Sequence, residues 1–491
     1  MSTQEVAATL SSYSLQQYWD WASISDLAGI ISDHSFRGRK MKRTEKSSFR
    51  DPSGHIFMLD GTVYRQINAS YSQSYDHLMA SGLYDEITKK NWLISHIELP
   101  DEPGAYKIIR PVQLVGINYP HEWSFSQLKD AALLTLQIQR TAIDRGMVLK
   151  DATGYNIVFT DQYPIFIDTL SFEIYDDSQP WVAYRQFCEC FLAPLLLAQH
   201  AGGDMIRMLS VHPNGIPLSL CSKLLPWTSR WKTLSSLHVH LQLSVASKKS
   251  AAEQNIIFSK AKMLRIIDHL HRGISDMSAG DKESTWGNYY NDSILPGQYL
   301  DDKKNAVVQL TEKISFRSVL DLGANQGEFS ILMAEKGKKV TATDSDHLAI
   351  DKLYLASKAR SMPITALVND LMNPSADMGW NNEERTRFSK RHQADLVMAL
   401  ALVHHLCIGK NLPFDMLFEG LSSLGQFLLI EFVPKHDEKV SLLLQHRKDV
   451  FDQYDEAHFE AAFREFYHLL EVMEIGSTGR KLYLLENKLR P

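Results

Sequence analysis

The sequence predicts two domains, an α+β domain followed by an α/β domain built on a mostly parallel sheet. Three observations support this fold class. The chain has 491 residues, which exceeds the roughly 250 to 300 residues at which a single hydrophobic core stops growing. Apolar strand-like runs alternate with helical patterns beyond residue 285. A segment rich in Ser, Gly, Asp and Asn at residues 275 to 293 separates this alternation from a mostly helical stretch.

The composition narrows the function classes. With 44% hydrophobic and 22% charged residues the chain has the composition of an ordinary globular protein. Its net charge of -6 supplies no field for a polyanion, which argues against a nucleic-acid partner. The 4 cysteines show no CxxC spacing, so we expect a reducing compartment. No basic, apolar leader begins the chain and no apolar run approaches the roughly 20 residues of a membrane span, which predicts a soluble, cytoplasmic protein.

The first part of the chain predicts an arm and an α+β domain. Residues 1 to 50 are polar and end in a basic cluster, as in a solvated arm. In "GHIFMLDGTVYRQI", alternating apolar residues flank Asp60 and Gly61, which predicts a hairpin. "FSQLKDAALLTLQIQRTAIDRG" has helical apolar spacing and should end at Gly146. The chain then reads as mostly helical to about 275, so this domain is placed at residues 51 to 275.

The second domain is placed at residues 285 to 491. Its seven strand-like runs predict a seven-stranded, mostly parallel sheet with helices on both faces. The last two runs are joined only by "GSTGR", so they should form an antiparallel hairpin at the edge of the sheet. The runs are "RSVLDL", "KKVTAT", "ITALV", "ADLVMAL", "GQFLLIEFV", "HLLEVMEI" and "KLYLLE".

The turn after the first of these strands predicts a nucleoside site. Asp321, Gly323, Asn325 and Gly327 occupy this turn, where glycine and asparagine permit positive φ and a close approach of backbone to a ligand. Asp344 ends the next strand, where its carboxylate could accept hydrogen bonds from two ribose hydroxyls. The phosphate-binding patterns GxxxxGK[ST] and GxGxxG are not met.

The motif "VLDLGANQGEFS" resembles the first motif of class I S-adenosylmethionine-dependent methyltransferases, which have a Rossmann-like fold. The resemblance covers about residues 285 to 490 and implies S-adenosyl-L-methionine as cofactor. It implies that Asp321 and the Gly323 to Gly327 backbone, with Asn325 between them, hold the methionine moiety and that Asp344 binds the ribose. Asp370 matches the acid that contacts the adenine amine. Asp395, which opens the fourth strand, is counted with these cofactor-binding residues.

Two histidines follow the fourth strand at the rim where substrates of such enzymes sit. A hydroxyl acceptor benefits from a base that takes its proton, and a histidine suits that role. Either His405 or His404 could serve. The strand carries no NPPY or DPPW run, which leaves oxygen, or an amine on a small molecule, as the methylated atom.

A second cluster of polar residues lies in "LKDATGYNIVFTDQYPIFID". The spacing of Asp151, Asn156 and Asp168 resembles the catalytic loop of the protein-kinase and aminoglycoside-phosphotransferase superfamily. This resemblance implies Asp151 as the acceptor base, Asn156 and Asp168 as ligands of Mg2+, and ATP as a second cofactor. Arg65 or Lys107 is the candidate for the strand lysine that grips the phosphates.

The chain as a whole resembles bacterial nodulation host-specificity methyltransferases, through "EWSFSQLKDAALLTLQIQ", "PIFIDTLSFE" and "PWVAYRQFC". This resemblance favours a small-molecule, carbohydrate or glycoconjugate acceptor and does not indicate an oligomeric state. Three functions follow. The first is a methyltransferase whose kinase-like domain recognises or presents the acceptor. The second is a bifunctional kinase-methyltransferase, and the third is a non-catalytic, nucleoside-sensing interaction protein.

Overall fold

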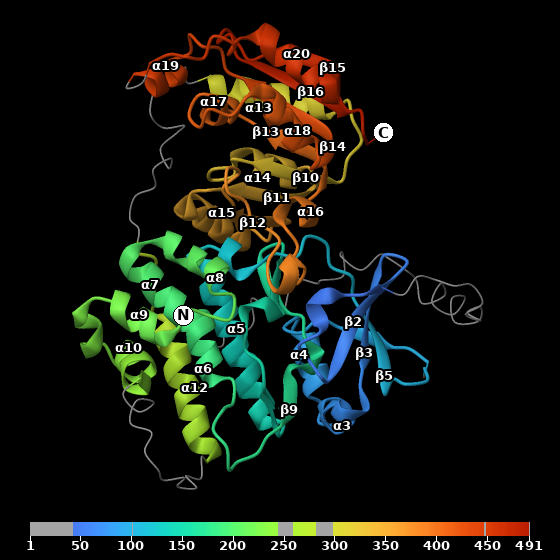
Figure 1. The fold of residues 1–491 in the computed structure, drawn as a ribbon, viewed down its shortest axis with the longest axis vertical. Coiled ribbons are helices and arrows are strands. Elements are labelled where there is room, and N and C mark those ends of the chain that lie inside the picture. The colour runs from blue at the N-terminus through green and yellow to red at the C-terminus, as the bar shows by residue number, and fades with distance from the viewer. Residues whose placement is uncertain (1–42, 101, 244–258, 281–297, 446–447, 491) are drawn as a thin grey trace.

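The computed structural model describes residues 43–100, 102–243, 259–280, 298–445 and 448–490, and Figure 1 gives the arrangement of its elements. Most of the predicted arm, residues 1–42, lies outside the described residues, as does the predicted linker from residue 281 onward. The last helix before that linker ends at Ser275, and the first helix after it begins at Tyr299.

The N-terminal region begins with a five-stranded sheet in the order β1-β2-β3-β5-β4, in which every neighbouring pair is antiparallel. The predicted hairpin is confirmed, because Asp60 and Gly61 join β2 to β3 with φ values of 51° and 77°. Two short helices separate β3 from β4. The bounds are β1 (Arg43–Thr44), β2 (Gly54–Leu59), β3 (Thr62–Ile67), α3 (Ser72–Ala80), α4 (Leu83–Lys89), β4 (His96–Glu98) and β5 (Lys107–Pro111).

The rest of this region is mostly helical, as predicted. Its central helix α5 (Phe125–Asp144) begins at the capping Ser124 and is followed by Gly146 with φ 73°. Two small antiparallel pairs follow, β6 with β9 and β7 with β8. The bounds are β6 (Met147–Leu149), β7 (Ile157–Thr160), β8 (Tyr163–Phe166), β9 (Phe172–Ile174), α6 (Tyr184–Phe187), α7 (Ala193–Ala201), α8 (Met208–Val211), α9 (Leu218–Leu224), α10 (Thr233–Ser235) and α12 (Lys260–Ser275).

The C-terminal region is a Rossmann-like α/β domain with a seven-stranded sheet in the order β12-β11-β10-β13-β14-β16-β15. Strands β10 to β14 run parallel, and β16 and β15 form the predicted antiparallel edge hairpin. All seven predicted strands are confirmed. Their bounds are β10 (Ser318–Leu322), β11 (Lys339–Asp344), β12 (Ile364–Val368), β13 (Ala394–Ala399), β14 (Gly425–Phe432), β15 (Tyr467–Glu474) and β16 (Lys481–Asn487).

Helices cover both faces of this sheet (Figure 1). They are α13 (Tyr299–Thr311), α14 (Glu328–Glu335), α15 (His347–Ala359), α16 (Phe388–Arg391), α17 (Val403–Cys407), α18 (Phe414–Ser422), α19 (Glu438–Leu444) and α20 (Glu456–Phe466). Among the described residues no helix has the length and apolarity needed to cross a bilayer.

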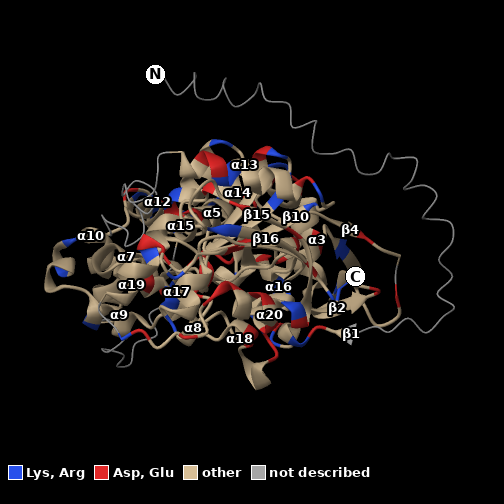
Figure 2. Cartoon of the chain, turned by 90° about the horizontal axis from the view of Figure 1, so that it is seen from above, with Lys and Arg blue, Asp and Glu red and all other residues tan. Residues whose placement is uncertain are grey.

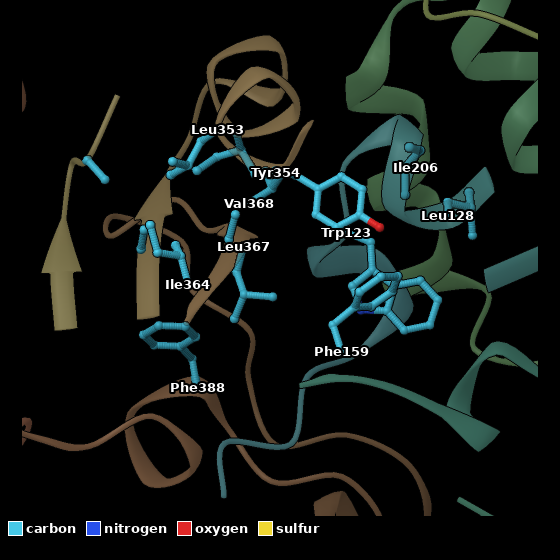
Figure 3. Packing of buried hydrophobic residues seen from close by; sticks show 14 of the residues in the cluster. Trp123, Leu128, Phe159, Ile206, Leu353, Tyr354, Ile364, Leu367, Val368 and Phe388 are labelled. Atoms are coloured by element: carbon cyan, nitrogen blue, oxygen red, sulfur yellow. The ribbon is translucent and has the colours of Figure 1, made fainter. Parts of the chain in front are cut away.

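The two regions share one hydrophobic core at the β12 edge of the sheet. Figure 3 shows Tyr354 of α15 pointing toward Trp123 and Phe159 of the N-terminal region. The rings of Phe159 and Tyr354 meet edge to face with centroids 5.7 Å apart. The side chain of Asp351, also on α15, accepts hydrogen bonds from the backbone N–H and hydroxyl of Ser126 at 2.7 and 2.9 Å.

The connection between β12 and β13 also packs against the N-terminal region. Arg391 of this connection forms an ion pair with Glu122 at 2.5 Å, with exposed side-chain fractions of 6% and 1%. The guanidinium of Arg385 lies 3.7 Å from the ring centroid of Tyr155. Because one partner of each contact comes from each region, the two regions are held together by buried polar contacts as well as by apolar packing.

Candidate functional site

The turn after β10 is built from three residues in the left-handed region. Gly323, Asn325 and Gly327 have φ values of 73°, 51° and 83°. A Cβ at Gly323 would lie 3.1 Å from Leu402, and one at Gly327 would lie 2.3 Å from Leu353. The turn therefore needs glycine at both ends for conformation and for space.

Asp344 connects this turn to the end of β11. Its carboxylate accepts the backbone N–H groups of Asn325 and Asp346, each at 2.9 Å. Burial raises the pKa of Asp344, and these amide hydrogen bonds act in the opposite direction. The amide of Ser345 also lowers this pKa as a third hydrogen-bond donor, so a carboxylate with about four acceptor positions keeps one for a ligand.

Other polar side chains line the same carboxyl edge of the sheet. Asp321 of β10 is 3% exposed and accepts a hydrogen bond from the Ser330 hydroxyl at 2.6 Å. Its burial raises its pKa to about 6. Asp370 follows β12 and accepts the backbone N–H of Met372 at 2.9 Å. The neighbouring Asn369 is 5% exposed, and its Nδ2 has no hydrogen-bond partner among the described residues.

The two predicted histidines lie together on α17, which follows β13. The ring centroids of His404 and His405 are 4.1 Å apart. His404 is 0% exposed, and neither of its ring nitrogens has a hydrogen-bond partner within the described part of the chain. Burial lowers the pKa of His405 to about 4 and holds the pKa of His404 well below its ordinary value. Both imidazoles are therefore neutral at pH 7.

The structure corrects the prediction for Asp395. This residue lies at the beginning of β13. It is therefore at the N-terminal ends of the parallel strands, whereas the glycine turn is at their carboxyl ends. Its carboxylate accepts the backbone N–H groups of Arg317 and Ser318 at 2.8 and 2.9 Å. Burial opposes its ionisation, but these hydrogen bonds hold its pKa below the usual value. Asp395 therefore fastens β13 to the start of β10 and lies at the opposite end of the parallel strands from Asp344.

Sequence reasoning missed a buried ionic network close to α17. Lys303 of α13 pairs with Glu431 of β14 at 2.6 Å, and both side chains are 0% exposed. Arg480 contacts Glu431 at 3.3 Å and Asp437 at 2.8 Å. Together Lys303 and Arg480 lower the pKa of Glu431 although burial opposes it. The signal in the sequence was one acid in the apolar strand "GQFLLIEFV", which requires a buried partner.

The N-terminal region does bring Asp151, Asn156 and Asp168 together, in the loops around β7 and β8. Burial raises the pKa of Asp151, with the charge of Asp168 as the second cause. Asp151 accepts a hydrogen bond from the Gln186 side chain at 2.7 Å. The Asn156 amide donates to the Ser171 hydroxyl at 3.0 Å, and this hydroxyl in turn donates to Asp168 at 2.6 Å.

The guanidinium of Arg65 lies against this cluster. It contacts Asp168 at 2.5 Å and Asp51 at 3.0 Å, and its side chain is 12% exposed. The other carboxylate oxygen of Asp168 accepts from Ser171, while the backbone N–H of Leu170 donates to the oxygen that faces Arg65. Within the described residues no group of three or more His, Cys, Asp or Glu is arranged to hold a metal. The residues predicted to bind Mg2+ are therefore engaged by groups of the protein itself.

Lys107, the other candidate for a phosphate-binding cation, points elsewhere. It belongs to β5 and lies 3.4 Å from Glu98 of β4. Of the two candidates, Arg65 on the adjacent strand β3 is the one that contacts Asp168.

Comparisons with known proteins identify one sequence relative of nearly full length. No family model matches the chain. The nodulation protein NoeA of Rhizobium meliloti (strain 1021) is 32% identical over 458 residues, which cover 89% of this chain and 95% of that protein.

Solved structures give more distant likenesses. The magnesium protoporphyrin IX methyltransferase of Synechocystis PCC 6803 is 16% identical with a TM-score of 0.29, over 39% of this chain and 83% of that chain. The N-methyltransferase NodS of Bradyrhizobium japonicum WM9 is 12% identical with a TM-score of 0.28, over 39% and 97%. The bifunctional kinase-methyltransferase WbdD is 18% identical with a TM-score of 0.26, over 41% and 42%.

The NoeA relationship spans the described N-terminal and C-terminal regions alike, since it extends over 89% of this chain. The chain therefore belongs to the family of the nodulation protein NoeA.

Proposed function

We propose that this protein is an S-adenosylmethionine-dependent methyltransferase that binds its cofactor at the carboxyl edge of the β10 to β14 sheet. The observation that carries the proposal is the carboxylate of Asp344, held by two backbone N–H groups beside a turn that requires Gly323 and Gly327. In a doubly wound sheet this edge, where the strand order reverses, is the place where ligands bind. After β10 the chain adds β11 and β12 on one side and then β13 and β14 on the other, so the strand order reverses beside β10.

The residues of this edge fit the cofactor. The remaining acceptor capacity of the Asp344 carboxylate suits the ribose, and Asp370 and the Asn369 amide, which has no hydrogen-bond partner among the described residues, suit the adenine. The acidic Asp321 suits the cationic methionine end of the molecule. When bound, S-adenosylmethionine supplies an activated methyl group, so the chain's own task is to align the acceptor and to exclude water.

His405 is the group that we assign to the acceptor proton. Burial holds its pKa near 4, so its imidazole is unprotonated over the whole physiological range and is a weak base there. We expect the methylation rate to be flat between pH 5 and 8 and to fall only toward pH 4, where the imidazole becomes protonated. The variant His405→Gln should be slower at every pH, and a rate equal to that of the unaltered protein would remove this assignment.

Titration calorimetry tests the cofactor site. Asp344→Ala should lose roughly 2 to 3 kcal/mol of affinity for S-adenosylmethionine, the order expected when a charged hydrogen-bond acceptor is removed. Asp395→Ala is the matched control, because this acid belongs to the same sheet but lies at its other edge. Absence of heat with both S-adenosylmethionine and its demethylated product, in the unaltered protein, would refute the proposal.

We assign the N-terminal region a role in recognising the acceptor, a small molecule or a saccharide. Its topology supports a kinase-like domain: a five-stranded antiparallel sheet, then a helix, then the β6–β9 and β7–β8 pairs with Asp151 and Asp168 in the intervening loops. Supplying extracts with a labelled methyl donor and separating the products by size and charge would identify the acceptor.

Phosphotransfer is the second function that this topology suggests, and the contacts of Arg65 argue against it. Magnesium would have to displace a guanidinium that pairs with both Asp168 and Asp51. The acids present therefore do not fit the metal that phosphotransfer needs. We expect no ATP binding that depends on Mg2+, and binding that disappears in Asp168→Ala would instead establish a bifunctional enzyme.

A further inference from the structure

The strongest unexplained surface lies on the helical side of the N-terminal region, where two tryptophans project into solvent. Trp227 and Trp231 are 72% and 78% exposed, although tryptophan is on average a highly buried residue. Leu224, at the end of α9, is 50% exposed beside them in the chain. In Figure 1 the elements α9 and α10, which flank this segment, lie at the outer edge of the molecule.

The charged side chains of residues 205 to 252 are all basic. No Asp or Glu occurs anywhere between residues 205 and 252, although the whole chain contains 58 of them and carries a net charge of -6. Three exposed basic residues, Lys223, Arg230 and Lys232, alternate with the exposed apolar ones and form no ion pair with any described residue. Burial lowers the pKa of both His240 and His200, and the nearby charges of Arg230 and Lys232, respectively, lower it further.

Side-chain hydrogen bonds fix the 3-10 helix that carries the two tryptophans. The ring of His240 bridges two segments, since Nδ1 contacts the Ser222 hydroxyl and Nε2 contacts the Ser229 hydroxyl, each at 2.9 Å. Ser222 belongs to α9, and Ser229 belongs to the 3-10 helix Trp227–Trp231 itself. The exposed rings are thus presented on a hydrogen-bonded platform, which reduces the entropy lost on binding.

We propose that this surface docks the protein on an anionic lipid membrane. The surface consists of Lys223, Leu224, Trp227, Arg230, Trp231 and Lys232. Tryptophan prefers the boundary between lipid headgroups and acyl chains, because one part of its ring system is apolar and its N–H is polar. Lysine and arginine beside it bind anionic headgroups. Docking of this kind requires no membrane-spanning helix and leaves the cofactor site on the other domain.

The same observations favour a membrane over the two other partners that exposed tryptophans could serve. A saccharide stacks on aromatic rings and is held most strongly when carboxylates accept from its hydroxyls, and residues 205 to 252 contain no Asp or Glu. An acidic protein would match the charge, but the apolar side chains are separated by basic ones and do not form a closed apolar core, which protein interfaces have. Figure 2 shows lysine and arginine at the edge of the molecule near α9 and α10.

Flotation of the full-length protein with lipid vesicles tests the proposal. We expect association with vesicles of phosphatidylcholine and phosphatidylglycerol, little association with phosphatidylcholine alone, and release by high salt. Trp227→Ala/Trp231→Ala should reduce association at least about tenfold, from the lost apolar area. Arg230→Gln and Lys232→Gln should each reduce it about fivefold.

Matched control variants distinguish docking through this surface from non-specific adsorption to the vesicles. Trp380 is 75% exposed but belongs to the connection between β12 and β13, so Trp380→Ala should leave association unchanged. Lys352→Gln removes an exposed charge from α15 and should also have no effect. Circular dichroism of each variant would establish that it is folded.

Two outcomes would overturn the proposal. One is no flotation with anionic vesicles. The other is equal loss in Trp380→Ala and in the double variant. Tryptophan fluorescence that responds to a soluble oligosaccharide such as cellohexaose, in the absence of any vesicle binding and only while Trp227 and Trp231 are present, would assign the surface to glycan recognition instead.

Discussion

At the end of β11 the carboxylate of Asp344 accepts two backbone N–H groups, whereas before β9 the carboxylate of Asp168 is paired with the guanidinium of Arg65. Asp344 is the last residue of β11 and Asp168 lies just after β8, and both stand where a resemblance predicted a ligand. Backbone amides hold a carboxylate in place without neutralising it, so it can still bind. A guanidinium neutralises its partner and fills the space beside it. The comparison teaches that the partners of an acid, more than its position in a motif, decide whether it can bind a ligand.

A similar difference applies to the cations. Near the carboxyl end of β14, Lys303 pairs with Glu431, and Arg480 pairs with Glu431 and Asp437. In the N-terminal region Lys150 lies 3.6 Å from Asp51 and 2.6 Å from the Ser53 hydroxyl, next to Arg65. Asp344 is thus held by backbone amides, while Asp51 and Asp168 of the N-terminal region are paired with Arg65.

The largest expected effect comes from breaking the buried ionic network of Lys303, Glu431 and Arg480. Glu431→Ala leaves Lys303 buried without its partner, which should lower the free energy of unfolding by about 3 to 5 kcal/mol. Glu471→Ala is the matched control: it breaks a pair with Lys313 whose side chains are 36% and 47% exposed, so it should cost under about 1 kcal/mol. Denaturant unfolding measures both, and equal losses would contradict the importance given to burial.

A smaller effect is expected in the glycine turn. Gly327→Ala places a Cβ against Leu353 in a left-handed conformation, so it should lower both the melting temperature and the affinity for S-adenosylmethionine, the latter by about 2 kcal/mol or more. Gly61→Ala has a similar φ of 77° with nothing within 4 Å of the added Cβ, so only the backbone cost of about 1 kcal/mol should appear. Unchanged cofactor affinity in Gly327→Ala would separate this turn from the cofactor.

In the N-terminal region, Arg65→Met should remove the guanidinium that pairs with Asp51 and Asp168 and leave these carboxylates accessible to a metal ion. We expect a loss of about 1.5 to 3 kcal/mol in stability from the removed charged hydrogen bonds. We also expect Mn2+ binding that the unaltered protein lacks, because Asp168 loses its cation and Asp51 keeps only Lys150 at 3.6 Å. Paramagnetic broadening detects the bound ion, and affinity for S-adenosylmethionine should stay the same. If the unaltered protein binds Mn2+ equally well, Arg65 does not block the site.

The smallest effect concerns the pH dependence of cofactor binding. Asp321 titrates near pH 6 because it is buried, and its ionised form suits a cationic ligand. Affinity for S-adenosylmethionine should therefore be constant above about pH 7 and fall toward tenfold per pH unit below 6. Asp321→Asn should bind more weakly at pH 7.5 and lose this dependence. Calorimetry at several pH values measures it, and parallel curves for the two proteins would dismiss the role of Asp321.

Much of the fold could be predicted from local patterns. The seven strands of the C-terminal sheet, the Asp60–Gly61 hairpin and helix α5 each depend on apolar periodicity and turn residues that are close in sequence. The approach of Asp321, Asp344 and Asp370 could also be expected, since carboxyl ends of neighbouring parallel strands meet at one edge. The same rule shows why the prediction for Asp395 was wrong: a residue that opens a parallel strand lies at the opposite edge.

The sequence by itself determined the order of helices and strands and the chemistry available at each strand end, because these depend on neighbouring residues. Only the tertiary structure decided which charges neutralise one another. Arg65 meets Asp168 across 103 positions and Lys303 meets Glu431 across 128, as their residue numbers give, and no local pattern records such a pairing. Whether an acid is free to bind a ligand follows from those long-range contacts, since an opposite charge a few ångströms away satisfies it first.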